Sequence, residues 1–157
     1  LDREGLAELV TLTTTLNKSA KDAALVARAH AATDVTGFGL LGHLHEMTAA
    51  SRVDARVFAS QMPILPEAIA HAQGGDQPGG LQANRRYLEP HVTLSEHADP
   101  AVVDLLFDPQ TSGGLLGCVP ARRAEAFAAA LRRRRVWHVA AGVVLRRGRH
   151  AVELLAS

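Results

Sequence analysis

One acidic residue, Asp34, stands where a short apolar segment meets a glycine-containing turn. Residues 33–43 read TDVTGFGLLGH, so a carboxylate at a strand end is followed by two glycines and then by an apolar helical pattern. Such a turn projects the carboxylate and lets backbone N–H groups approach a phosphate. Two interpretations are open from the residues alone. Asp34 either belongs to a metal or anion site or caps the helix that follows.

A second polar stretch, residues 108–116, reads DPQTSGGLL. Asp-Pro starts a turn, Thr111 and Ser112 offer hydroxyls, and Gly113 and Gly114 free the backbone before an apolar strand. Hydroxyl and N–H groups that converge at a strand start can hold an anion. A tight turn into a buried strand needs the same residues, so the spacing alone does not decide between these roles.

Two histidines follow the first turn. His43 and His45 point about 200° apart on a helix, whereas zinc pairs usually lie four residues apart. The spacing therefore predicts surface or capping histidines rather than a zinc site. Asn17 and Lys18, which interrupt an alanine-rich helical pattern, are interpreted as a solvated turn of helix.

A glycine-rich segment, residues 74–80, reads GGDQPGG and predicts an irregular loop. Such a loop is either a mobile lid or a long connection. Arg85 and Arg86 follow it, at the start of a predicted helical turn. Solvated surface charge is the favoured interpretation of both arginines, and contact with phosphate is the alternative.

Helices and strands must alternate to position these residues. Hydrophobic periodicity predicts helices over residues 2–31, 40–51, 67–71, 100–106 and 120–135, and strands over residues 29–33, 53–59, 92–94, 115–119, 136–145 and 151–155. Gly142 is a candidate bulge, and the last two strands are predicted to form a hairpin. This order indicates an α/β fold with a mixed β-sheet of about six strands sandwiched by helices.

Composition limits the class of protein. With 157 residues, 47% hydrophobic and 21% charged, the chain is predicted to form one domain over residues 1–157. A net charge of +1 argues against nucleic-acid binding, and the arginines at 132–135 suit the end of a helix. A single cysteine, Cys118, excludes an internal disulfide. No apolar run or signal peptide predicts a membrane location, and Leu1 in place of Met suggests a piece of a longer chain.

The two polar stretches carry a resemblance. TDVTGFGLLGHLHEM at residues 33–47 and LLFDPQTSGGLL at residues 105–116 resemble selenophosphate synthetase, also called selenide, water dikinase. TTLN at residues 14–17, and PGG at residues 78–80 followed by Asn84, agree with that family's pattern. The resemblance covers the chain as the family's C-terminal domain. It implies the C-terminal fold of the aminoimidazole ribonucleotide synthetase superfamily.

The resemblance implies a cytoplasmic enzyme that makes selenophosphate from selenide, ATP and water and releases AMP and phosphate. Mg²⁺ ions bridge the ATP phosphates in such a reaction. The aspartate of the DVTGFG motif is a magnesium ligand in the family, and here it is Asp34. Contact with substrate or phosphate is expected from the polar and glycine residues of the same motifs, namely Thr36, Gly37, Asn84, Thr111, Ser112, Gly113 and Gly114.

The remaining machinery is implied to lie elsewhere. In the family, the other metal ligands, a lysine and a reactive cysteine or selenocysteine belong to an N-terminal ATP-binding domain. We therefore expect no catalytic residue in this chain, no activity from it alone, and a homodimer of the full protein. Cys118 is interpreted as a small core residue. The alternatives are another ATP-dependent synthetase or kinase of the superfamily, a non-catalytic binding module, or nucleic-acid binding through residues 132–135.

Overall fold

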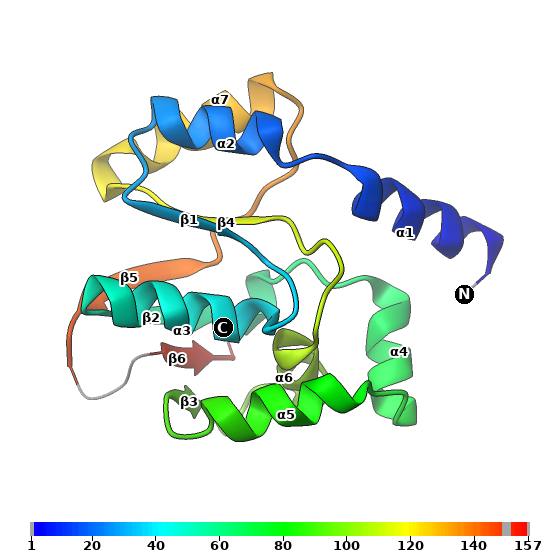
Figure 1. Cartoon of the computed structure of the whole chain (residues 1–157). Helices are drawn as coiled ribbons and strands as arrows, with labels where there is room; N and C mark the ends of the chain where they lie inside the picture. The colour runs from blue at the N-terminus through cyan, green and yellow to red at the C-terminus, as the bar shows by residue number, and fades with distance from the viewer. Residues whose placement is uncertain (1, 149–151, 157) are drawn as a thin grey trace.

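The computed structural model describes residues 2–148 and 152–156 (Figure 1). After two N-terminal helices, strands and helices alternate along the chain. The order is α1 (Arg3–Thr14), α2 (Lys18–Val26), β1 (Ala31–Asp34), α3 (Gly39–Ser51), β2 (Val53–Phe58), η1 (Ala59–Gln61), α4 (Pro66–Gly74), α5 (Gly79–Leu88), β3 (Val92–Leu94), α6 (Pro100–Phe107), β4 (Leu115–Cys118), η2 (Ala121–Arg123), α7 (Ala124–Arg133), β5 (Gly142–Arg146) and β6 (Val152–Leu155).

The strands of the described residues form two sheets. Four strands lie in the order β3-β6-β2-β5, with β2 parallel to β6 and antiparallel to β5, so this sheet is mixed. The other two strands, β1 and β4, form a separate antiparallel pair above it (Figure 1). The predicted α/β class with a mixed sheet between helices is confirmed, but the six strands are divided between two sheets.

The predicted hairpin at the end of the chain is wrong, because β2 lies between β5 and β6. Burial agrees with the order. In β6, which lies between β3 and β2, Val152 and Leu154 are 0% exposed, whereas Val143 and Val144 of the edge strand β5 are about half exposed, at 47% and 50%. The last strand but one also begins at Gly142 and not at residue 136, so Gly142 opens the strand instead of forming a bulge within it.

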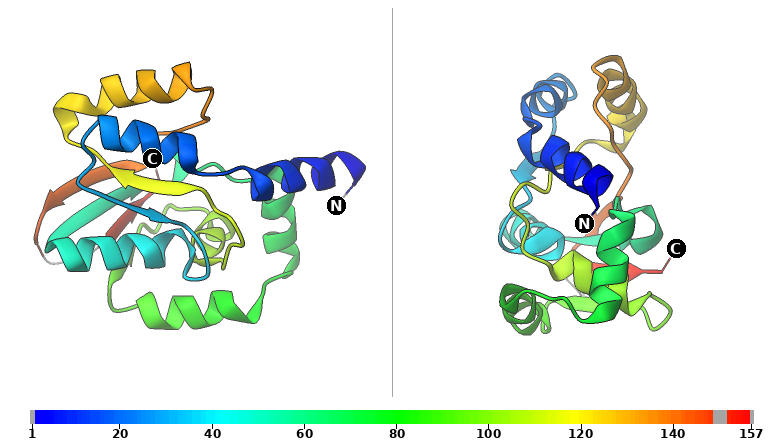
Figure 2. Two further views of the ribbon diagram at one scale, coloured as in Figure 1. Left: turned by 45° about the horizontal axis from the view of Figure 1, so that its top comes forward. Right: turned by 90° about the vertical axis from the view of Figure 1, so that its right-hand side faces the viewer.

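The single helix predicted over residues 2–31 is in fact two helices, α1 and α2. Thr11, Thr14 and Thr15 each donate a hydroxyl hydrogen bond of 2.6–2.8 Å to the carbonyl four residues earlier. Thr15 itself is extended, with ψ 123°, and ends α1. Clustered threonines favour such a break, because their branched side chains are restricted in a helix and compete for its carbonyls. None of the residues of α1 is buried, and α1 projects from the body (Figure 2).

The main hydrophobic core lies between the four-stranded sheet and helices α3, α5 and α6. Its buried members are Leu41, Leu44, Ala55, Val57, Ala59, Leu81, Leu88, Val103, Leu106, Phe107, Val152 and Leu154. A smaller cluster of Ala23, Ala130 and Leu131 joins α2 to α7, which lie beyond the β1–β4 pair (Figure 1). Within residues 2–148 and 152–156, no helix is long and apolar enough to cross a bilayer.

The irregular segment predicted at residues 74–80 is shorter than expected. Gly74 is the last residue of α4, and Gly79 already begins α5. Gly75 adopts φ +84° and ends α4 in the left-handed conformation that glycine favours. Asn84, Arg85 and Arg86 therefore belong to a regular helix, with both arginines in its last turn, and not to the start of a turn.

The two histidines of α3 are not surface residues as predicted. His43 is buried, with 8% of its surface exposed. The ring of His45 is half-buried and stacks on His91, with centroids 4.3 Å apart and planes 19° apart, and Tyr87 meets both rings edge-on. The partners of His45 come from α5 and the turn after it, whereas the contacts of His43 are with Thr36, Phe38 and Glu46.

We expect acid to destabilise the folded chain through His45. Burial, and then the neighbouring His91, hold the pKa of His45 below its ordinary value of 6.5. The unfolded chain therefore takes up a proton at a higher pH than the folded chain does, so the free energy of unfolding falls as the pH drops below about 6.5. Thermal unfolding between about pH 7.5 and pH 5 measures this slope. His45→Gln should flatten it, whereas the same change at the exposed His97 should not.

Candidate functional site

Pairing of β1 with β4 brings the two polar stretches together. Asp34 lies opposite Leu115 in the register of the pair. Beyond it, the Val35 N–H donates to the Gly114 carbonyl at 3.0 Å, and the Gly113 N–H donates to the Val35 carbonyl at 2.9 Å. Two segments almost 80 residues apart in the sequence thus form one surface. We call residues 34–39 and 108–114 the paired turns.

The first of the paired turns, residues 34–39, packs against α5 and α6. The Asn84 side chain, 9% exposed, donates its amide to the Gly37 carbonyl at 3.0 Å and to the Phe107 carbonyl at 2.9 Å. Gly39 adopts φ +67°, and a Cβ there would lie 2.8 Å from the Phe107 carbonyl carbon. The turn therefore approaches the end of α6 as closely as a glycine permits.

Asp34 is exposed at the end of β1. Its Oδ1 accepts a hydrogen bond of 2.7 Å from the Asn17 side-chain amide, and its Oδ2 has no hydrogen-bond partner among the described residues. The capping interpretation is wrong, because α3 begins at Gly39 with Phe38 as its N-cap residue and without a side-chain cap. One carboxylate oxygen thus remains free to bind a ligand.

Asn17 is the residue of this site that sequence reasoning missed. Asn17 lies in the short connection between α1 and α2, beside β1. Its side chain donates to Asp34, 17 residues further along the chain, and so orients that carboxylate. The interpretation of Asn17 as part of a solvated helical turn is wrong, because Asn17 lies between two helices and hydrogen-bonds to Asp34, and periodicity does not reveal the end of α1. The TTLN pattern at residues 14–17 was the one signal that pointed to it.

The other predicted site residues divide into two groups. Thr36, Gly37 and Thr111 are exposed and Ser112 is half-buried, so their polar groups are near solvent. The backbones of Gly113 and Gly114 instead join the paired turns to each other. Ahead of them, Asp108 is half-buried, its Oδ1 has no hydrogen-bond partner, and burial raises its pKa.

The donor set limits which metal site this chain can provide. Within residues 2–148 and 152–156, no three side chains of His, Cys, Asp or Glu lie together as a metal cluster. Mg²⁺ is commonly held by one or two carboxylates, with phosphate oxygens and water completing its shell. The free oxygen of Asp34 fits one position of such a shell. Further ligands of a Mg²⁺ ion bound there would come from water or from outside the described residues.

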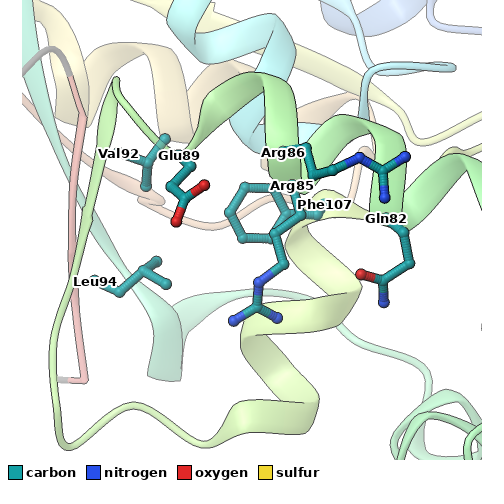
Figure 3. A pocket seen from close by; sticks show the side chains of 7 residues that line it. All are labelled: Gln82, Arg85, Arg86, Glu89, Val92, Leu94 and Phe107. Atoms are coloured by element: carbon teal, nitrogen blue, oxygen red, sulfur yellow. The ribbon is translucent and has the colours of Figure 1, made fainter.

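A surface hollow of about 260 Å³ has none of the paired turns among its lining residues (Figure 3). It is lined by Gln82, Arg85, Arg86, Glu89, Val92, Leu94 and Phe107. The Arg85 guanidinium forms an ion pair with Asp104 and lies 5.7 Å from the centre of the Phe107 ring. Its charge is therefore balanced within the fold. Arg86 remains exposed, which supports the interpretation of solvated surface charge.

Cys118 lies at the end of β4, on the far side of the pair from the turns. It is half-buried beside a hollow of about 140 Å³, and burial raises the pKa of its thiol. A thiol with a raised pKa is a poor nucleophile near neutral pH. The prediction of a small core residue is not confirmed, however, because Cys118 is only half-buried and belongs to neither hydrophobic cluster.

Comparison with known proteins gives a family and several relatives. Residues 3–154 match the family described as AIR synthase related protein, C-terminal domain. The chain is 38% identical to selenide, water dikinase of Clostridium botulinum (strain Eklund 17B / Type B), over 81% of this chain and 37% of that protein. It is 46% identical to selenide, water dikinase of Pelobacter propionicus, over 71% of this chain and 33% of that protein. The chain thus spans about a third of the length of these relatives, and the predicted resemblance is confirmed.

Proposed function

The chain belongs to the AIR synthase related family as its C-terminal domain, and from this we propose that it is the C-terminal domain of a selenide, water dikinase. The proposed whole enzyme converts selenide, ATP and water into selenophosphate, AMP and orthophosphate in the cytoplasm. The observation that carries the proposal is the exposed carboxylate of Asp34, oriented by Asn17 on the surface of the paired turns. That carboxylate stands at the acidic position of the DVTGFG motif.

In the proposed enzyme, Asp34 contributes one oxygen to a Mg²⁺ ion that is otherwise held by the N-terminal ATP-binding domain and the nucleotide. Bound magnesium supplies Lewis-acid stabilisation of the charge on the phosphates. The paired turns present polar groups beside it. We assign substrate or phosphate contact to the exposed or half-buried members Thr36, Gly37, Thr111 and Ser112, and the shaping of the surface to Asn84, Gly113 and Gly114.

The partner domain follows from the same reasoning. A single carboxylate and two polar turns supply few of the oxygen ligands and cations that a triphosphate with its Mg²⁺ ions needs, so this chain alone is not expected to turn over ATP. We propose that the N-terminal ATP-binding domain of the same protein supplies the reactive groups, and that the full protein is a homodimer.

The test is an assay of product identity. The complete protein, supplied with selenide, ATP and Mg²⁺, should release AMP and orthophosphate only when selenide is present, and this chain alone should release neither. ADP as the product would indicate another synthetase or kinase of the superfamily. No consumption of ATP by the complete protein would indicate a binding module.

Asn17→Ala in the complete enzyme is expected to lower kcat by roughly 10- to 100-fold, because the change frees the Asp34 carboxylate to rotate away from the position that Asn17 sets. The melting temperature should change little, since Asn17 is only half-buried. Lys18→Ala is the matched control, because Lys18 is the next residue and is exposed. Equal activity of the two variants would exclude an orienting role for Asn17.

A further inference from the structure

His43 is a buried polar side chain that the proposed function does not use. It lies in the first turns of α3 with 8% of its surface exposed, and the Phe38 ring is tilted against it at a centroid distance of 5.6 Å. Its Nε2 atom lies 3.1 Å from the hydroxyl oxygen of Thr36 in the first of the paired turns. Its Nδ1 atom lies 3.5 Å from a carboxylate oxygen of Glu46, one turn further along α3.

These two contacts select one tautomer of the neutral ring. A neutral imidazole carries one N–H donor and one nitrogen acceptor. The Glu46 carboxylate attracts a proton on Nδ1 and repels an Nδ1 lone pair. With the proton on Nδ1, Nε2 is an acceptor, and the Thr36 hydroxyl at 3.1 Å is its donor.

We infer that His43 is a positioning residue that accepts a hydrogen bond from the hydroxyl of Thr36. Thr36 then presents only oxygen lone pairs to the ligand. Glu46 takes part by holding the proton on Nδ1. A threonine hydroxyl has a single proton and two lone pairs, so a proton donated to His43 is not available to a phosphate oxygen. Thr36 therefore faces a cation, or a water that donates to it, rather than the phosphate anion itself.

This assignment deepens the proposed function and rests on it for the identity of the ligand. The direction of the hydrogen bond between Thr36 and His43 does not depend on the proposed function. The sequence motif made Thr36 a candidate contact for substrate or phosphate. The hydrogen bond to the buried His43 ring limits that contact to a cation, or to a water that donates to Thr36, and excludes a phosphate oxygen. No part of the assignment requires His43 to change its charge.

The first test reads the tautomer directly. Histidine-labelled chain, examined by nitrogen-15 NMR at a pH where His43 is neutral, should show a protonated Nδ1 and an unprotonated Nε2. Glu46→Gln should raise the population of the other tautomer, and because Glu46 is exposed the chain should remain folded. A proton found on Nε2 in the unaltered chain would overturn the inference and would leave the proposed function untouched.

The second test is a double-mutant cycle in the complete enzyme. Thr36→Val removes the hydroxyl and keeps the side-chain shape, and it should raise the Mg²⁺ concentration needed for half-maximal activity by about tenfold, whereas Thr36→Ser should not. His43→Gln should have a similar effect alone and no further effect in the Thr36→Val background, because His43 acts through Thr36. Additive losses would show a merely structural role and would contradict the inference.

Discussion

Replacing Asp34 by asparagine in the complete enzyme is expected to lower kcat by about 100-fold or more, which corresponds to roughly 3 kcal/mol in the activation free energy. Asparagine keeps the size of the side chain but removes the negative charge. The carbonyl oxygen of asparagine still accepts the hydrogen bond from Asn17, so the local geometry is retained. What is lost is the charged oxygen that a hard cation such as Mg²⁺ prefers.

The fold should survive the change at Asp34, because the residue is exposed and contributes nothing to either hydrophobic cluster. Thermal unfolding of the variant should lie within about 2 °C of the parent protein. Asp22→Asn is the control for a general effect of charge, since Asp22 is also partly exposed and pairs with Lys21 on the surface of α2. Full activity after Asp34→Asn would remove the metal role from the proposal.

Local sequence features were enough to locate Asp34 and the helix after it. A strand that ends in a carboxylate and a turn that contains glycines depend on neighbours within a few residues, and α3 ends at Ser51 as periodicity predicted. The helix predicted from residue 100 begins at Pro100, and Asp99 caps it through the Ala101 N–H, which is also a local contact.

Features that depend on distant partners were not predictable in this way. Nothing local in Val35 or Gly114 indicates that their backbones are hydrogen-bonded to each other. The position of β6 between β3 and β2 likewise depends on pairing with strands distant in sequence, whereas adjacency in sequence suggested a hairpin instead. The burial of His43 depends on packing around α3, and a hydrophobic pattern alone does not reveal which polar side chain such packing covers.

The paired turns therefore combine two kinds of constraint. The position of Asp34 at a strand end follows from neighbouring residues, but the orientation of its carboxylate depends on Asn17 and its surroundings depend on the β1–β4 pair. The close approach of Gly39 to Phe107 connects this surface to the main hydrophobic core, because the Phe107 side chain is 1% exposed. A change at the glycine should consequently affect stability as well as the site.

Gly39→Ala is expected to destabilise the chain by about 3 kcal/mol and to lower its melting temperature by roughly 10 °C. The left-handed conformation at φ +67° costs an alanine about 1–2 kcal/mol. The new Cβ would also lie 2.8 Å from the backbone of Phe107, which cannot move without disturbing the core. Gly37→Ala is the matched control in the same turn, since a Cβ there meets nothing within 4 Å, and its stability should be unchanged or slightly raised. Thermal and denaturant unfolding of both variants measures the difference, and equal stabilities would contradict the close approach of the turn to α6.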